Sequence, residues 1–146
     1  MIDYKSLTQA DPTENENLCN KVISNILYQT RNFLKLSRPE VAAMSGICVE
    51  TVLRIERGHN CELTSYEKII YYYKDELKSP LMDELADSIL TLYWTKREYT
   101  TFRPYDVTQM RNIHFKETYS KLERNYNKCS TLSMKFKEYI HQKSEK

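Results

Sequence analysis

The chain has 146 residues, of which 40% are hydrophobic, and a formal net charge of +2. It contains only two glycines and four prolines, which excludes a turn-rich β fold and favours an all-α fold of one ordinary domain with an appendage. No apolar run approaches the roughly 18 residues of a membrane span, and the first residues do not form a secretory signal, so we expect a cytoplasmic protein without membrane contact.

The small net charge conceals an uneven distribution along the chain. Residues 1–94 carry 10 basic and 14 acidic residues, a net of −4, whereas residues 95–146 carry 12 and 6, a net of +6. Net charge of this size neither requires nor excludes a nucleic-acid partner. The partner therefore has to be inferred from local motifs.

Residues that would support catalysis or metal binding do not cluster in the sequence. The four cysteines and three histidines lack the spacing of metal ligands and of disulfide frameworks. They are Cys19, Cys48, Cys61, Cys129, His59, His114 and His141. Two glycines are too few for a phosphate-binding loop. We therefore expect reduced thiols, no metal, no cofactor and no enzymatic activity.

The first predicted helix begins at residue 11. Residues 1–10 show no periodicity, and we expect them to be flexible. Asp11 is a good N-cap, Pro12 suits the first helical position, and Glu14 follows three residues after the cap. Apolar residues then recur at helical spacing, which predicts a helix that ends near Lys35.

The two glycines bracket one short segment. Ser37 and Glu40 have the spacing of a capping box, which predicts the start of a short second helix. Gly46 stands where a tight turn between helices needs a positive φ. A third helix follows, with Cys48 at its N-cap and Gly58 as the C′ residue that ends it.

Two further helices are predicted before residue 95. Thr64 and Glu67 repeat the capping-box spacing and predict the start of a fourth helix. Ser79 followed by Pro80 predicts the start of a fifth. Five helices joined by short loops predict one compact domain over residues 11–94.

The region after residue 94 breaks this pattern. Threonines and aromatic residues in segment 95–105 favour extended backbone, which predicts a linker or a short strand. Residues 106–146 form a C-terminal extension, in which we expect one long helix to about Gln142. Its apolar positions alternate spacings of four and three residues. This heptad seam consists of Phe115, Tyr119, Leu122, Tyr126, Cys129, Ser133, Phe136 and Ile140. Such a seam suits packing on the chain's own domain or against a partner, as in a dimer.

Residues 38–57 read RPEVAAMSGICVETVLRIER. This segment resembles the helix-turn-helix of the phage repressor and Cro family, the XRE-type domain. The resemblance covers about residues 12–94 and implies a five-helix, lambda-repressor-like DNA-binding domain, with the C-terminal extension outside the match. The resemblance depends on a small residue, a turn glycine, three core-facing aliphatic residues and a glycine after the motif. They are Ala42, Gly46, Ile47, Val52, Ile55 and Gly58.

The family also pairs an arginine of the first helix with a glutamate near the end of the motif. Those two places hold Arg31 and Glu56. A partly buried carboxylate needs such a partner because an unpaired buried charge is costly, and a guanidinium can bind it with two hydrogen bonds. The resemblance therefore implies an ion pair between Arg31 and Glu56.

In this family the second helix of the motif lies in the major groove, and its outward residues meet base edges. By position, the resemblance assigns base reading to Val49, Glu50, Leu53 and Arg54. It assigns contact with phosphates to Arg38, Thr51, Arg57 and Asn60.

The function implied is sequence-specific binding of double-stranded DNA by a repressor-like transcriptional regulator. Such a regulator acts as a homodimer on operator half-sites about one helical turn apart. The alternative is an antitoxin-like or other protein-interaction module, which retains the helix-turn-helix fold and binds a protein partner through the C-terminal helix. A toxin gene beside its own, or a tightly co-purifying protein, would favour that alternative.

Overall fold

The computed structural model describes residues 12–100 and 113–144, and within these ranges it contains six helices and no strand. The expected all-α class is confirmed. The helices are α2 (Pro12–Phe33), α3 (Arg38–Ser45), α4 (Val49–Glu56), α5 (Leu63–Leu77), α6 (Pro80–Tyr99) and α8 (Ile113–Ser144). None of the helices in the described ranges combines the length and the apolar character that crossing a membrane requires.

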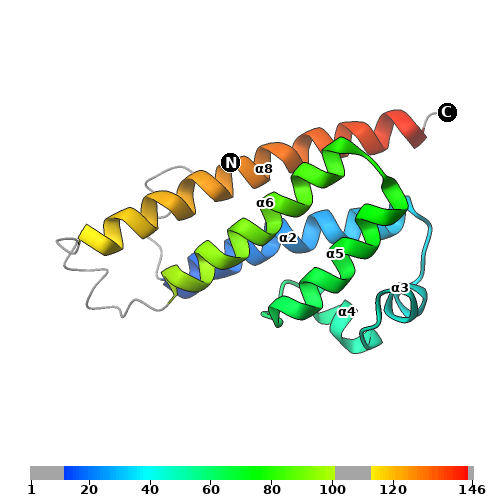
Figure 1. Cartoon of the computed structure of the whole chain (residues 1–146), viewed down its shortest axis with the longest axis horizontal. Helices are drawn as coiled ribbons and strands as arrows, with labels where there is room; N and C mark the ends of the chain where they lie inside the picture. The colour runs from blue at the N-terminus through cyan, green and yellow to red at the C-terminus, as the bar shows by residue number, and fades with distance from the viewer. Residues whose placement is uncertain (1–11, 101–112, 145–146) are drawn as a thin grey trace.

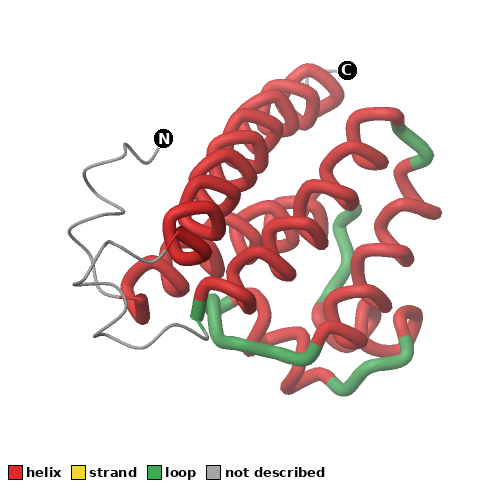
Figure 2. The backbone as a smooth tube through the Cα atoms, turned by 60° about the vertical axis from the view of Figure 1, so that its left-hand side comes forward, coloured by secondary structure: helices red, strands yellow, loops and turns green. Residues whose placement is uncertain are grey.

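Three long helices, α2, α6 and α8, run along the long axis of the molecule (Figure 1), and each packs against the other two. Helices α3, α4 and α5 gather at one end of this layer. There α5 packs on α6 and α3, while α4 packs on α3 and α2. Figure 2 shows that α3, α4, α5 and α6 follow one another through short loops. The short helices are therefore held against the long ones by tertiary packing.

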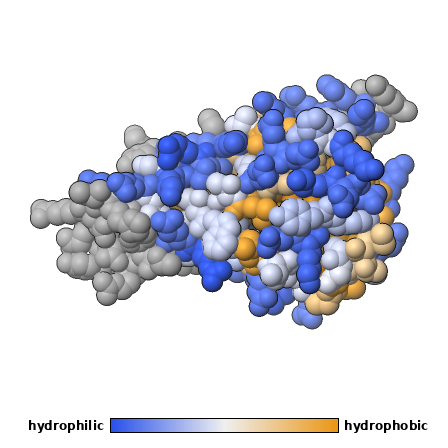
Figure 3. Space-filling model, in the orientation of Figure 1, coloured by the Kyte–Doolittle hydropathy of each residue, from blue (hydrophilic) through white to orange (hydrophobic). Residues whose placement is uncertain are grey.

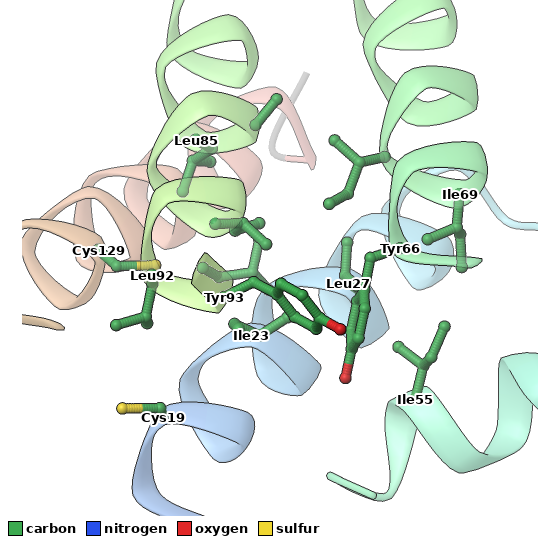
Figure 4. Packing of buried hydrophobic residues seen from close by; sticks show 14 of the residues in the cluster. Cys19, Ile23, Leu27, Ile55, Tyr66, Ile69, Leu85, Leu92, Tyr93 and Cys129 are labelled. Carbon is green, nitrogen blue, oxygen red and sulfur yellow. The ribbon is translucent and has the colours of Figure 1, made fainter. Parts of the chain in front are cut away.

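One continuous apolar core joins the short helices to the long ones. Figure 4 shows Ile55 of α4, Tyr66 of α5 and Tyr93 of α6 pointing into the same space. The ring centroids of Tyr66 and Tyr93 lie 5.3 Å apart, and Ile23 of α2 lies close by and is fully buried. Full burial of a large apolar side chain stabilises the fold by about 1.5–3 kcal/mol. Every described helix contributes buried residues to this core.

Most of the predicted helix ends are confirmed. Ser37 and Glu40 form both hydrogen bonds of the capping box at the start of α3. Gly46 and Gly58 both have φ of +81°, the left-handed conformation that glycine enters without a steric penalty. Ser79 caps α6, with its hydroxyl accepting from the Leu81 amide. The N-cap predicted at Asp11 lies outside the described residues.

The predicted start of α5 is wrong by about two residues. The N-cap is Glu62, and the helix begins at Leu63, so the spacing of Thr64 and Glu67 does not mark a capping box. The amide of Tyr66 donates to the Glu62 carbonyl, and the Tyr66 side chain is 2% exposed. Thr64 therefore lies inside the first turn of α5, and that turn places the Tyr66 ring in the core.

The extended backbone predicted for residues 95–105 is wrong in its first part, because α6 continues through Tyr99. Tyr99 is fully buried. Its ring centroid lies 6.1 Å from that of Tyr119, and its hydroxyl accepts a hydrogen bond of 2.8 Å from Asn15. These tertiary contacts outweigh the local preference of threonines and aromatics for extended backbone. Residues 101–105 lie outside the described residues.

The heptad seam of the C-terminal helix is packed inside the chain. Helix α8 lies on α6 and α2, and the seam residues that the structure describes are buried except for Ile140, which is half-buried. The side chain of Phe115, and residues 106–112, lie outside the described part. The seam from Tyr119 to Ile140 is therefore part of the core, and its buried positions do not offer an exposed surface for a dimer.

Candidate nucleic-acid interface

The turn between α3 and α4 is built around Gly46. The amides of Gly46 and Ile47 both donate to the Ala42 carbonyl, at 3.0 and 3.1 Å, which closes the last turn of α3. A Cβ added at Gly46 would meet no atom within 4 Å. The positive φ, and not lack of space, is therefore what requires glycine there. Ala42 is buried and Ile47 is half-buried.

A buried carboxylate fixes α4 to its neighbours. Glu56, whose side chain is 1% exposed, accepts from Arg31 Nε at 2.7 Å and from Arg31 Nη2 at 3.0 Å. Arg31 Nη1 donates to the Leu36 carbonyl at 3.0 Å. The hydrogen bonds to Glu56 raise the pKa of the Arg31 guanidinium. The ion pair implied by the resemblance is thus present, and it joins α2 to the end of α4.

Arg38 supplies a second guanidinium to the same carboxylate. Its Nε lies 2.9 Å from Glu56 Oε1, and its side chain is 39% exposed. The sequence assigned Arg38 to phosphate contact, but in the structure its Nε is used inside the protein. Two guanidiniums from α2 and α3 around one carboxylate from α4 satisfy the charge that its burial would otherwise leave costly.

The outer face of α4 is open to solvent. Val52 and Ile55 on the inner face are buried, whereas Val49 is 44% exposed. Glu50 and Arg54 are also exposed. Leu53, the fourth residue assigned to base reading, is half-buried. Figure 3 shows apolar residues at the surface at the end of the molecule where α3 and α4 lie, and Met44 and Val49 are exposed there.

The residues assigned to phosphate contact differ in their surroundings. Arg57 is exposed at the C-cap of α4. Thr51 is half-buried, and its hydroxyl lies 2.9 Å from the Cys48 sulfur. Cys48 is exposed at the N-cap of α4 without a side-chain capping bond. The Thr51 hydroxyl and its backbone amide lower the pKa of the Cys48 thiol.

Asn60, the fourth residue assigned to phosphate contact, is exposed, but its side-chain amide is hydrogen-bonded within the protein. Its Oδ1 accepts from Asn20 Nδ2 at 2.8 Å and from Lys96 Nζ at 3.1 Å, and its Nδ2 donates to Glu16. Both ends of the Asn60 amide are thus used inside the protein. Nothing in the local sequence predicted this network, because its members come from positions 16, 20, 60 and 96.

Lys96 is the buried centre of that network. It is 4% exposed, its Nζ also donates to Asn20 Oδ1 at 2.8 Å, and it lies 4.9 Å from the centroid of the Tyr93 ring. Burial lowers the pKa of its ammonium group. The sequence pattern placed Lys96 in a predicted linker. In the structure it ties the last turns of α6 to α2 and to the loop between α4 and α5.

The described residues contain no group of three or more histidine, cysteine or acidic side chains that could hold a metal ion. Comparisons with known proteins give no match to a family model, to a curated protein or to a solved structure. The function therefore has to be argued from the geometry of α3, α4 and their surroundings.

Proposed function

We propose that this protein binds double-stranded DNA sequence-specifically as a repressor-like transcriptional regulator, with α3 and α4 as a lambda-repressor-like helix-turn-helix. The observation that carries the proposal is the combination at α4 of a fixed inner side and an open outer side. Glu56 is bonded by Arg31 and Arg38, while Val49 and Arg54 on the other side are exposed. A helix that enters a groove needs both properties.

The outer residues of α4 have chemistry that can distinguish base pairs. Arg54 can donate two hydrogen bonds to guanine, and Glu50 can accept from the cytosine amino group. Val49 and Leu53 can contact the methyl group of thymine. Arg57 is exposed at the end of α4 and can contact a phosphate without reading sequence.

Dimerisation belongs to the same proposal, since two half-sites raise affinity and fix spacing. Two surfaces are candidates for the dimer interface, the exposed side of α6 and the seam of the C-terminal helix α8. The seam residues from Tyr119 to Phe136 are buried within the chain. The proposed interface is therefore the outer side of the first turns of α6 (Pro80–Tyr99), where Asp83 and Asp87 are exposed.

A protein-interaction module is the second candidate, and one observation favours it. Met44 is 64% exposed and Val49 is 44% exposed, and apolar side chains near the turn suit a protein surface as well as thymine methyl groups. In that case the protein would bind a protein partner through the α3–α4 corner, which comprises α3, α4 and the turn between them. It would then not select operator DNA.

Selection of genomic DNA fragments by the purified protein, with its solution mass measured alongside, tests the proposal. Recovery of one shared sequence by a dimer supports it. Arg54→Ala is expected to weaken binding to that sequence by about 1–3 kcal/mol and to relax the preference at one base position. Arg57→Ala is expected to weaken all sequences alike and to reduce the salt dependence.

Arg124→Ala is the matched control, because Arg124 is exposed on α8. This variant should bind like the wild type. If Arg54→Ala and Arg57→Ala also bind genomic fragments as well as the wild type, DNA recognition does not use this face of α4.

A further inference from the structure

A surface hollow of about 630 Å³ lies beside α4, between the start of α5 and the last turns of α6. Thr51 and Arg54 line it from α4, Ser65 from α5, and Arg97 from α6. Two arginines from helices far apart in the sequence thus line the same hollow. Glu62, at the N-cap of α5, is the carboxylate among its lining residues, so the arginines leave the lining with a net positive charge.

The position of Arg97 is held by its neighbours. Its guanidinium lies 6.0 Å from the centroid of the Trp94 ring, and Trp94 is 54% exposed. A cation–π contact at this distance favours a position of the guanidinium over the ring. The preceding residue, Lys96, is bonded to Asn60 at 3.1 Å, and the Tyr93 hydroxyl donates to the Cys61 carbonyl at 3.4 Å. The last turns of α6 are therefore fixed against the loop that follows α4.

We infer that this hollow binds a phosphate group of the DNA backbone, with Arg97 as a phosphate-contact residue that the sequence did not assign. The inference rests on the proposed function. If the outer face of α4 lies in the major groove, phosphates run along both edges of that groove, and the hollow adjoins the same helix. A guanidinium fork bonds phosphate oxygens bidentately, and the hydroxyls of Thr51 and Ser65 are further donors.

The test compares Arg97→Ala, Arg97→Lys and the control Arg124→Ala with the wild-type chain. Binding to a selected DNA fragment and to an unrelated fragment is measured over a series of salt concentrations. Arg97→Ala should lose affinity several-fold on both fragments, and the slope of log affinity against log salt should fall by about 0.9, the value for one phosphate contact. Arg97→Lys should keep the slope but lose part of the affinity, because an ammonium is not a fork.

Three results would overturn the inference while the proposed function stands. One is wild-type affinity of Arg97→Ala in the assay in which Arg57→Ala is weakened. Another is an equal loss in Arg124→Ala, which would assign the effect to net charge. The third is a loss confined to the selected fragment, which would mean that Arg97 reads a base.

If the wild type binds no DNA but Arg97→Ala abolishes capture of an acidic protein, both proposals are wrong. Arg97 is exposed, so melting of the variant should match the wild type.

Discussion

The α3–α4 corner and the layer of long helices are stabilised in different ways. In the corner, two helices of eight residues each depend on a turn at Gly46 and on the buried Glu56 carboxylate. In the layer, α2, α6 and α8 bury large side chains along most of their length. The corner is thus stabilised by a few specific contacts, whereas the layer is stabilised by the large apolar surface that it buries.

This difference determines which surface remains open for binding. The apolar stripe of α8 is covered by α6 and α2, as the burial of Tyr119, Leu122 and Phe136 shows. The corner is anchored from one side only, through Val52, Ile55 and the carboxylate of Glu56. Its other side is free to meet a partner, which is where a binding surface can lie without loss of stability.

The largest effect is expected from a change in the layer. Phe136→Ala removes a ring that is 1% exposed, and truncation of a buried phenylalanine costs about 3–5 kcal/mol. We expect the free energy of unfolding, measured in urea, to fall by that amount. Binding through the corner should be unchanged at a temperature where the variant is still folded.

Met134→Ala is the matched control for that experiment. Met134 is on the same helix but is 63% exposed, and surface substitutions change stability by roughly 0.5 kcal/mol or less. A similar small cost for Phe136→Ala would mean that α8 does not pack on α6 in solution, and the contrast between the two regions would be lost.

A smaller loss is expected when the corner is broken at Arg31. Arg31→Ala leaves Glu56 with the single bond from Arg38 Nε at 2.9 Å. Removing one partner of a buried ion pair costs about 3–5 kcal/mol, and because Arg38 remains we expect about 2–3 kcal/mol. Thermal melting should show the loss, and DNA affinity should fall with it because α4 is no longer held in place.

A double variant distinguishes the charge from the packing. Arg31→Met combined with Glu56→Met removes both buried charges and fills similar volume, which is often neutral for stability. Recovery of stability together with reduced DNA affinity would show that the ion pair serves the orientation of α4. An unchanged melting temperature in Arg31→Ala alone would contradict the pairing.

The corner was more predictable from the sequence than the C-terminal end of α6. Ser37 and Gly46 act through bonds and dihedral angles within a few residues, so spacing alone revealed their roles. The end of α6 depends on Tyr99, which is buried by Asn15 and Tyr119. Contacts between residues so far apart in the chain leave no pattern in the local sequence. The predicted linker therefore began at residue 95, although α6 continues to Tyr99.

The candidate site shows the same limit. The Arg31–Glu56 pair followed from a resemblance that includes both positions. The second guanidinium, from Arg38, and the bonds of Asn60 to Lys96 did not. Both depend on where helices cross in space, and an arginine or an asparagine on a helix edge is equally compatible with a phosphate in the sequence alone.

The smallest expected effect is a loss of stability at alkaline pH, to which the buried thiols of the layer contribute and the exposed thiol of the corner does not. Burial raises the pKa of Cys19 to about 12 and that of Cys129 to about 11. A folded pKa above the unfolded one means that stability is complete below the unfolded value near 9 and is lost as pH rises toward the folded value. Between pH 7 and pH 10 each thiol should therefore reduce the free energy of unfolding by about 1 kcal/mol.

Cys19→Ala should abolish its own share of this alkaline loss, measured as the difference between urea unfolding at pH 7 and at pH 10 under a reducing agent. Taking the difference removes the cost of the small cavity, which is the same at both pH values. Cys48→Ala is the control from the corner: its thiol is exposed and its pKa is lowered, so its removal should not reduce the loss. If Cys48→Ala reduces the loss and Cys19→Ala does not, then Cys19 is not buried in solution as the packing of α2 requires, and burial does not separate the thiols of the two regions.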